Sequence, residues 1–351
     1  MSIESSIDAN HAARVLLDSG LVILPTETVY GLAARADDEQ AVARVYETKG
    51  RPRGHPLIVH VADHVSAFTS TWVHEPTDLA RSLAQAFWPG PLTLVLSRGS
   101  RAGDDITGGQ PTVALRVPAH PLAQKVLREM DRLDPIGAPH GIAAPSANRF
   151  GRVSPTTMQH ALDDVGRFLR SPDFALDGGP TRWGVESTII DARGADAVIL
   201  RPGGVTAADL TAHGFTVNTT TSHRESQVRV PGTLASHYAP TAAVIVVHGP
   251  NELASELDRV RQRNDQSGGG GFLALASTPT PAGLHRLASP GSALDYAHDL
   301  YAALHNADAR GLDFVIALAP PADDGVSAAV LDRLTRAASP RETKPNASGL
   351  S

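Results

Sequence analysis

The chain of 351 residues contains no cysteine. Disulfide bonds, thiolate nucleophiles and cysteine-based zinc sites are therefore excluded. Lysine is scarce, because Lys49, Lys125 and Lys344 are its only occurrences, and arginine supplies nearly all the positive charge. The formal net charge of -6 argues against broad, sequence-independent binding of nucleic acid, which requires many phosphates to be neutralised. A locally basic pocket for a small anion remains compatible with this composition.

Long apolar runs and targeting features are also missing. No stretch approaches the roughly 18 consecutive apolar residues that predict a transmembrane helix, and residues 1–8 have neither the basic flank nor the apolar segment of a signal peptide. We therefore expect a cytoplasmic protein without membrane association. The sequence also lacks the standard P-loop, dinucleotide-binding, serine-hydrolase and zincin motifs, so none of those four classes is indicated.

Apolar runs that alternate with helical periodicity predict an α/β fold. A helix is expected to begin after Asp37 or Asp38, either of which can serve as its N-cap. Strands are expected at residues 21–24, 56–61, 92–96, 112–117, 142–145, 188–191 and 197–200, and further helices at 8–19, 76–88 and 156–165. We expect residues 1–212 to form one catalytic domain.

The remainder of the chain predicts a second, smaller domain. Residues 213–240 have no clear periodicity and are rich in Thr, Ser, His and Pro, which indicates a long interdomain linker. Residues 241–338 are expected to form a Rossmann-like α/β domain. Its expected strands are 243–247, 272–276 and 314–318, and its expected helices are 250–263 and 293–306. We expect residues 268–271 to form a flexible turn and residues 339–351 a disordered tail.

Polar side chains gather at the ends of the apolar strands. Thr28, Arg116, Ser146 with Asn148, and Arg201 each lie at or just beyond a predicted strand. Individually such residues often serve as turns or caps. An arginine inside an apolar strand, however, needs a partner or a ligand. Together these residues indicate a pocket for a small polar molecule.

A basic segment between residues 44 and 53 contains Arg44, Lys49, Arg51 and Arg53 against one acid, Glu47. Exposed arginines are usual on protein surfaces, but this segment enters a buried strand, and the planar guanidinium suits phosphate. His60 and His64 are four residues apart, yet His60 falls in a strand, so the two do not predict a metal site. No pattern requires a covalent nucleophile, which favours catalysis by positioning and charge neutralisation.

Several motifs resemble the YrdC-like threonylcarbamoyl-AMP synthases in their long two-domain form. Residues 25–32 (PTETVYGL) resemble the opening signature of the family, and Lys49-x-Arg51 and Ser146-x-Asn148 match its paired K-x-R and S-x-N motifs. Residues 231–232 and 237–240 resemble its interdomain linker motif. The resemblance implies an open twisted mixed sheet with helices, followed by the smaller Rossmann-like domain.

The resemblance also implies a reaction. The family makes threonylcarbamoyl-AMP and pyrophosphate from L-threonine, bicarbonate and ATP, with Mg²⁺ accompanying ATP and no protein metal site. The product passes to a tRNA threonylcarbamoyl-transferase complex, and no stable binding of nucleic acid is expected. The residues implied for threonine are Thr28, His60, Arg116, Ala144 and Ser187. Those implied for ATP are Arg51, His55, Thr112, Ser146, Ser154, Arg201 and Tyr238. The residues implied for catalysis are Lys49, Arg51 and Asn148.

This sequence departs from the family pattern at three places. His55 stands where the family often has Asn, residues 134–141 form a longer stretch than usual, and residues 233–236 replace basic and aromatic residues of the linker. There are two alternatives to the synthase. One is a double-stranded RNA-binding module of the same fold without synthase activity, and the net charge of -6 and the scarcity of lysine argue against it. The other is carbamoyl transfer, which would predict additional zinc-finger-like and acylphosphatase-like regions, whereas the chain has no cysteine.

Overall fold

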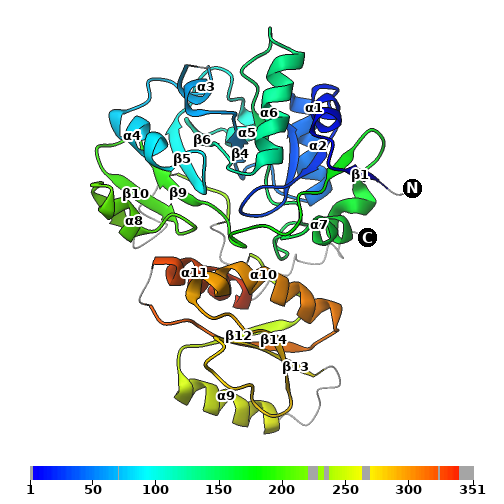
Figure 1. Ribbon diagram of the computed structural model, residues 1–351, viewed down its shortest axis with the longest axis vertical. Helices are drawn as coiled ribbons and strands as arrows, with labels where there is room; N and C mark the ends of the chain where they lie inside the picture. The colour runs from blue at the N-terminus through cyan, green and yellow to red at the C-terminus, as the bar shows by residue number, and fades with distance from the viewer. Residues whose placement is uncertain are drawn as a thin grey trace, which may run out of the picture.

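Two β-sheets organise the chain, and Figure 1 shows them as two α/β units packed against each other. The computed structural model describes residues 3–69, 71–219, 228–232, 237–262, 269–322 and 325–339. In the described part of the chain, the first sheet has eleven strands in the order β1-β8-β2-β3-β7-β4-β6-β5-β9-β10-β11. The second has four, in the order β12-β15-β13-β14. The predicted fold class, an open mixed sheet followed by a smaller Rossmann-like unit, is confirmed.

The first sheet carries helices on both faces. Its strands are β1 (Glu4–Ser6), β2 (Val22–Leu24), β3 (Gly31–Arg35), β4 (Ile58–His60), β5 (Leu92–Ser97), β6 (Thr112–Arg116), β7 (Ile142–Ala143), β8 (Phe174–Leu176), β9 (Thr188–Asp191), β10 (Ala197–Arg201) and β11 (Val217–Thr219). Its helices are α1 (Ala9–Leu17), α2 (Glu39–Lys49), α3 (His64–Thr69), α4 (Asp78–Phe87), α5 (Asp104–Thr107), α6 (Pro121–Leu133), α7 (Met158–Val165) and α8 (Ala207–Ala212), with a 3₁₀ turn, η1 (Gly166–Phe168).

Alternate residues of β2 face opposite layers of the core. Val22 and Leu24 pack with residues of α1 and α6, whereas Leu21 and Ile23 pack with residues of α2 and α7. Successive side chains of a strand point to opposite faces, so a continuous apolar run is what a strand covered on both sides requires. The end of β2 therefore lies at a fixed place between two helical layers.

Helix α2 begins and ends at residues that place the K-x-R segment. Of the two aspartates expected as caps, Asp38 is the N-cap, and its carboxylate accepts from the amides of Gln40 and Ala41. The helix ends at Gly50, whose φ of 62° is left-handed and favours glycine. Lys49 is thus the last helical residue, and the chain reverses immediately so that Arg51 turns back toward the sheet.

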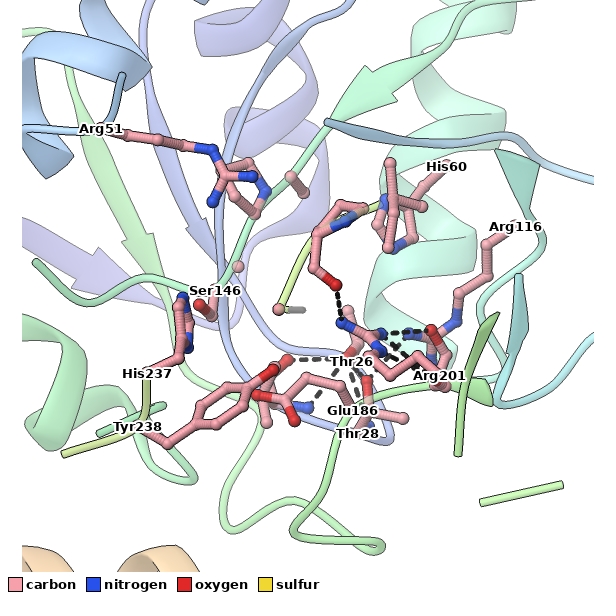
Figure 2. Close-up of a pocket in the computed structure, with 18 residues that line it drawn as sticks. Thr26, Thr28, Arg51, His60, Arg116, Ser146, Glu186, Arg201, His237 and Tyr238 are labelled. Carbon is pink, nitrogen blue, oxygen red and sulfur yellow. Dashed lines mark hydrogen bonds between the residues drawn. The ribbon is translucent and has the colours of Figure 1, made fainter. Parts of the chain in front are cut away.

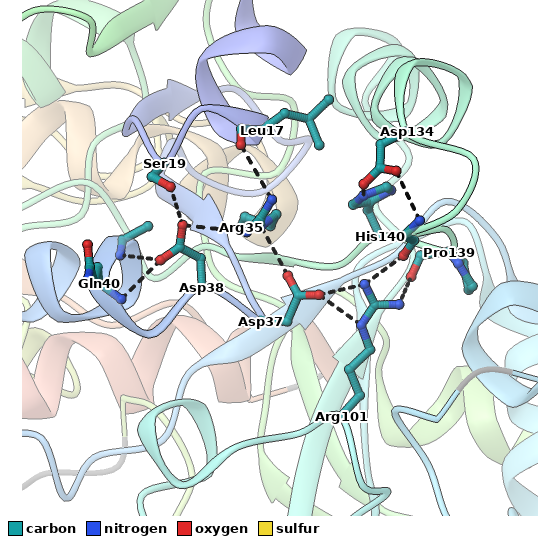
Figure 3. Close-up of polar contacts among 12 residues, drawn as sticks. Leu17, Ser19, Arg35, Asp37, Asp38, Gln40, Arg101, Asp134, Pro139 and His140 are labelled. Carbon is teal, nitrogen blue, oxygen red and sulfur yellow. Dashed lines mark hydrogen bonds and ion pairs between the residues drawn. The ribbon is translucent and has the colours of Figure 1, made fainter.

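The longer stretch at residues 134–141 is anchored just before β7, as Figure 3 shows. Arg101 pairs with Asp37 and donates to the carbonyls of Gly137 (2.7 Å) and Pro139 (2.9 Å). The two ring nitrogens of His140 lie 2.9 Å and 3.2 Å from carboxylate oxygens of Asp131 and Asp134. These contacts fasten both ends of the stretch to the surrounding structure.

The second sheet is parallel throughout and packs its helices on both faces. It consists of β12 (Ala243–Val247), β13 (Gly270–Leu273), β14 (Leu284–Ala288) and β15 (Phe314–Leu318), with helices α9 (Pro250–Gln262), α10 (Ala293–Ala309) and α11 (Gly325–Ala338). Helices α10 and α11 lie between this sheet and the first unit, and α9 covers the other face (Figure 1). Val29, Val153 and Val185 of the first unit join one apolar cluster with Tyr238 and residues of α10 and α11. The two units therefore share a core.

Three expectations about the second half need correction or lie outside the description. Strand β11 (Val217–Thr219) pairs with β10, so the first sheet continues past residue 212. Residues 220–227 and 233–236 of the expected linker, and 340–351 of the expected tail, lie outside the described residues. The expected glycine turn is wrong for Gly270 and Gly271, which begin β13, while Gly268 lies outside the described residues. A Cβ atom at Gly270 would lie 2.2 Å from the ring of Phe314, so glycine allows a close approach between strands.

No helix in the described part of the chain is long and apolar enough to cross a membrane.

Candidate active site

A pocket with an empty volume of about 570 Å³ lies where the central strands of the first sheet meet the linker. Figure 2 shows its side chains converging from both. Its lining includes nine of the residues implied by the family resemblance, namely Thr28, Arg51, His60, Arg116, Ala144, Ser146, Ser187, Arg201 and Tyr238. The remaining lining residues are Thr26, Val29, Gly31, Ile58, Pro145, Glu186, Pro231, Gly232 and His237.

Strand register, rather than a common edge, brings these residues together. Strand β4 is parallel to β6 but antiparallel to β7, so the contributing strands do not all end at the same edge. His60 of β4 pairs with Arg116 of β6. The amide of Ala144 donates to the carbonyl of Ile58, and Gly31 forms a bridge with Ser146. Because these strands are short, residues from both of their ends line one pocket.

The Thr26–Thr28 turn positions a hydroxyl group at the pocket. The Thr26 Oγ1 atom accepts from the amides of Thr28 and Val29 and lies 2.6 Å from the carbonyl oxygen of Val29. Thr26 is thus a turn residue that folds the segment. Thr28, by contrast, accepts a hydrogen bond of 2.9 Å from Arg116.

Arg116 has the partner that its place in an apolar strand requires. It is 3% exposed, and its guanidinium pairs with Glu27 while its Nε donates to the carbonyl of Gly90. Burial alone would raise the pKa of Glu27, but the charge and hydrogen bond of Arg116 hold it below its ordinary value. The pair is therefore ionised, and it fixes the guanidinium beside Thr28.

His60 presents a neutral ring to the pocket. Burial, and then the charge of Arg116, lowers its pKa to about 3. Its Nδ1 atom is buried and has no hydrogen-bond partner among the described residues. Since buried polar atoms are normally satisfied, an unpartnered nitrogen in a pocket lining indicates a ligand contact.

Two buried arginines form a cationic part of the pocket. Arg51 donates to the carbonyls of Pro56 and His55, and burial lowers its pKa to about 10. Arg201 donates to the carbonyl of Ser187 (2.8 Å and 3.1 Å), to the Ser187 hydroxyl and to the carbonyl of Pro231. Neither forms an ion pair with a carboxylate in the described part of the chain. Their charge can therefore serve an anionic ligand.

Lys49 and Asn148 lie beside the pocket and are not in its lining. The buried Lys49 Nζ donates to the carbonyls of Ser146 and Asn148. Burial, followed by the charge of Arg51, lowers the pKa of Lys49 well below its ordinary value. The Asn148 amide donates to the carbonyls of Arg149 and Arg152. In this arrangement Lys49 holds the backbone of the S-x-N signature and Asn148 holds the loop that follows it. A direct catalytic role for either side chain stays a prediction.

Three residues implied for ATP lie outside the lining. His55 is partly exposed, and its ring lies 5.6 Å from that of Phe150. Thr112 begins β6, at the opposite end from Arg116. Ser154 does not line the pocket, but its hydroxyl donates to the lining residue Glu186 (2.6 Å). Their predicted contacts with nucleotide remain untested.

Sequence reasoning missed Glu186, and it assigned no role to His237. Glu186 is held by Ser154, Tyr301 and Arg333, and the last two lie more than a hundred positions away in the sequence, so no local pattern marks it. Burial lowers the pKa of His237 to about 3, and its Nδ1 has no partner among the described residues. The only signal for His237 was its place beside Tyr238 in the linker motif.

The protein side chains alone offer little for a metal ion. The described residues contain no group of three or more His, Asp or Glu side chains that could hold one. The single carboxylate in the lining, Glu186, already accepts three hydrogen bonds. Mg²⁺ readily binds through substrate phosphates with few protein ligands.

Comparisons with known proteins agree along nearly the whole chain. A family model described as "Telomere recombination" (Sua5/YciO/YrdC) matches residues 14–203, and one described as "Threonylcarbamoyl-AMP synthase, C-terminal domain" matches residues 205–339. A threonylcarbamoyl-AMP synthase of Bacillus subtilis is 38% identical, over 94% of this chain and 92% of that protein. One of Pyrococcus abyssi is 36% identical, over 95% and 94%.

A solved structure supports the same assignment. The crystal structure of P. abyssi Sua5 complexed with L-threonine superposes with a TM-score of 0.83 at 34% identity, covering 96% of this chain and 98% of that one. Sequence identity, domain order and fold thus agree over both units. The chain belongs to the threonylcarbamoyl-AMP synthase family, in its two-domain form, and is an enzyme.

Proposed function

We propose that this enzyme condenses L-threonine, bicarbonate and ATP to threonylcarbamoyl-AMP and pyrophosphate. The observation that carries the proposal is that two sets of side chains line one pocket. One set, the amino-acid part, holds Thr28, His60 and the charge-compensated Arg116; the other, the nucleotide part, holds Arg51 and Arg201, which form no ion pair with a carboxylate among the described residues. A small amino acid suits the first set and a polyphosphate the second.

The chemistry proposed is an acyl-adenylate formation. The amine of threonine and bicarbonate give a carbamate with loss of water. A carbamate oxygen then attacks the α-phosphorus of ATP, the bond to the β-phosphate oxygen breaks, and pyrophosphate leaves. Both reactants are anions, so cations that reduce their repulsion supply much of the catalysis.

In the amino-acid part, Arg116 would bind the carboxylate of threonine. Glu27 keeps the guanidinium fixed, and His60 offers its unpartnered ring nitrogen to a polar group of the substrate. Ser187 and the backbone of Ala144 lie in the same lining and complete the predicted threonine contacts. The P. abyssi structure with L-threonine supports a threonine site in this fold.

In the nucleotide part, Arg51, Arg201, Ser146 and Tyr238 would contact ATP. Mg²⁺ would enter bound to the phosphates and reduce their charge. Lys49 lies outside the lining, and it would position Ser146 and Asn148 by donating hydrogen bonds to their carbonyls. His55, Thr112 and Ser154 remain proposed contacts with the outer parts of the nucleotide.

The product is a mixed anhydride that water destroys. We propose that it is passed to a tRNA threonylcarbamoyl-transferase complex in the cytoplasm, and that this enzyme itself needs no RNA. Pyrophosphate release tests the proposal, because it should require threonine and bicarbonate together and should not change when double-stranded RNA is added. Release that ignores threonine, or tight RNA binding without synthesis, would favour the RNA-binding alternative.

A matched pair of variants tests the nucleotide part. Arg51→Ala should reduce kcat/KM for ATP by about tenfold or more, because a charge-assisted hydrogen bond to phosphate is lost. Arg53→Ala changes an exposed arginine two residues away that does not line the pocket, and it should retain activity. Equal losses in the two variants would contradict the assignment of Arg51.

A further inference from the structure

Arg333 lies in the C-terminal unit and yet reaches the wall of the pocket. It projects from α11, is 0% exposed, and its Nε donates to Glu186 at 2.8 Å. The same guanidinium donates to the carbonyl of Pro202 at 3.0 Å, directly beside Arg201. Tyr301 of α10 donates to the same Glu186 oxygen at 2.8 Å. Two side chains from the second unit therefore hold one carboxylate of the first.

Glu186 is an unusual group in a pocket proposed for ATP. It is buried, it lines the pocket, and its negative charge would repel a triphosphate. Burial alone would raise its pKa, but Arg333, and next Arg201, lower it to about 2, so the group is ionised. A buried carboxylate of this kind must be neutralised by a cation, and two cations lie near enough to do so.

The contacts show how the two arginines divide this task. Arg333 forms ion pairs with Glu186 and with its neighbour Asp332, and Asp332 is also paired with Arg336. Arg201 donates only to the oxygens of Ser187 and Pro231, so its charge has no carboxylate partner in the described part of the chain. If Arg333 were absent, Arg201 would be the remaining cation for Glu186.

We propose that Arg333 is a positioning residue for ATP binding: it neutralises Glu186, and thereby leaves the charge of Arg201 available to the polyphosphate. This inference rests on the proposed function. It gives the C-terminal unit a definite part in the site through Glu186, and the same guanidinium lies over the ring of Tyr238 in the lining, 5.2 Å from its centroid.

The amino-acid part of the pocket should respond much less. There the buried cation is Arg116, which has its own carboxylate, Glu27, and its own hydroxyl partner, Thr28. Neither Arg333 nor Glu186 donates to or accepts from these residues in the contacts described. Ser187 links the two sets, because it follows Glu186 in the chain and its hydroxyl accepts from Arg201 at 3.2 Å. The proposal therefore predicts a separation of KM values that general loosening of the structure would not produce.

The test uses the full chain with Arg333→Met, which keeps an unbranched apolar stem and removes the guanidinium with its charge. Pyrophosphate release should show KM for ATP raised about tenfold or more, since one charge-assisted contact is withdrawn, while KM for threonine changes less than about threefold. Arg310→Met, at an exposed arginine whose side chain donates to Asn306 on α10, is the control and should leave both values unchanged.

The double variant Glu186→Gln/Arg333→Met distinguishes charge from packing. A neutral Gln cannot form an ion pair with Arg201, so Arg201 stays available to the phosphates. The double variant should therefore bind ATP about as tightly as the wild type. Similar increases in both KM values for Arg333→Met, or a double variant that binds ATP no better than the single one, would overturn the proposal. If Arg333→Met does not fold, the double variant alone decides, because the glutamine at position 186 carries no charge and Asp332 keeps its ion pair with Arg336. A tenfold loss of ATP affinity in the double variant would then overturn the proposal.

Direct binding of a non-hydrolysable ATP analogue, measured by calorimetry, separates the two hypotheses. If wild-type protein binds the analogue but releases no pyrophosphate with threonine and bicarbonate, the proposed function fails, while the charge argument is still tested by the affinities of the variants. If synthesis is normal and the variants bind the analogue equally, only the inference about Arg333 fails.

Discussion

At the scale of single residues, burial decides which groups carry charge in the pocket. The two histidines of the lining, His60 and His237, both have pKa values lowered by burial to about 3. Both are therefore neutral near pH 7. Arg51 and Arg201 keep their charge, since even the lowered pKa of Arg51 is about 10. The positive potential that ATP would meet thus comes from arginine, and it should not change between pH 6 and 8.

The lowered pKa of His60 predicts a pH dependence of stability. The unfolded chain binds a proton at this side chain below about pH 6.5, whereas the folded protein binds it only near pH 3. The unfolded state therefore holds more protons in between, and the free energy of unfolding falls as the pH falls through that window. Each such histidine contributes up to about 1.4 kcal/mol per pH unit.

Urea denaturation of wild type and His60→Asn between pH 6.5 and pH 5 measures this effect, because most carboxylates stay ionised over that range. The slope of the unfolding free energy against pH should be shallower in His60→Asn. His64→Asn, at an exposed histidine outside the lining, is the control. Identical slopes for wild type and His60→Asn would contradict a buried neutral His60.

Residue patterns predicted part of the site and not the rest, for a physical reason. Thr28, Arg116 and Ser146 could be selected because polar groups at the ends of apolar strands are visible locally. The partners of buried charges are not visible in this way. Glu27 lies 89 positions from Arg116, and Glu186 lies 147 positions from Arg333, so only the folded chain shows either pair.

At the scale of elements, several apolar strands were predicted correctly, whereas the helices α6 and α11 were not among the expected elements. The strands β9, β12 and β15 have the predicted bounds. Strand β11, with the sequence Val-Asn-Thr, is too short and polar to be recognised, and its place in the sheet depends on pairing with β10. The shared core between the units was equally invisible, because it depends on how α10 and α11 lie against the first unit.

One close contact between the units gives a prediction at this scale. Gly184 has a φ of 69°, and a Cβ atom there would lie 2.3 Å from the carbonyl oxygen of His298 on α10. Gly184→Ala should therefore suffer both the left-handed backbone cost, about 1–2 kcal/mol, and a clash with the helix backbone. We expect a lower melting temperature and a weaker contact between the units.

Gly179→Ala is the matched control. Gly179 has a similar φ of 72°, but a Cβ atom there meets nothing within 4 Å. It should show the backbone cost alone, so the difference between the two melting temperatures reports the contact with α10. If Gly179→Ala lowers the melting temperature as much as Gly184→Ala, the packing at Gly184 adds nothing and the prediction is wrong.

At the scale of the whole molecule, the pocket belongs to both halves of the chain. Pro231, Gly232, His237 and Tyr238 line it from beyond the first sheet, and Arg333 and Tyr301 hold Glu186 from the second unit. The sequence predicted two domains and a linker that contributes Tyr238 to the ATP site. It could not predict that side chains of the second domain bind Glu186 in the pocket lining, because that contact depends on packing between distant segments.

Truncation therefore tests the integrity of the whole molecule. A chain ending at Thr219 keeps the complete first sheet, but it loses Tyr238 and the other linker residues of the lining, and it exposes the shared cluster around Val29 and Val185. We expect synthesis to fall below detection, because a closed pocket is needed to protect a carbamate and a mixed anhydride from water.

A chain ending at Ser339 is the control. It retains every described residue, and it should keep full activity. Since all three tryptophans, Trp72, Trp88 and Trp183, lie in the first unit, their fluorescence shows whether the shorter chain still folds. Full activity in a folded chain that ends at Thr219 would show that the first unit suffices, and would remove the need for any contribution from the second.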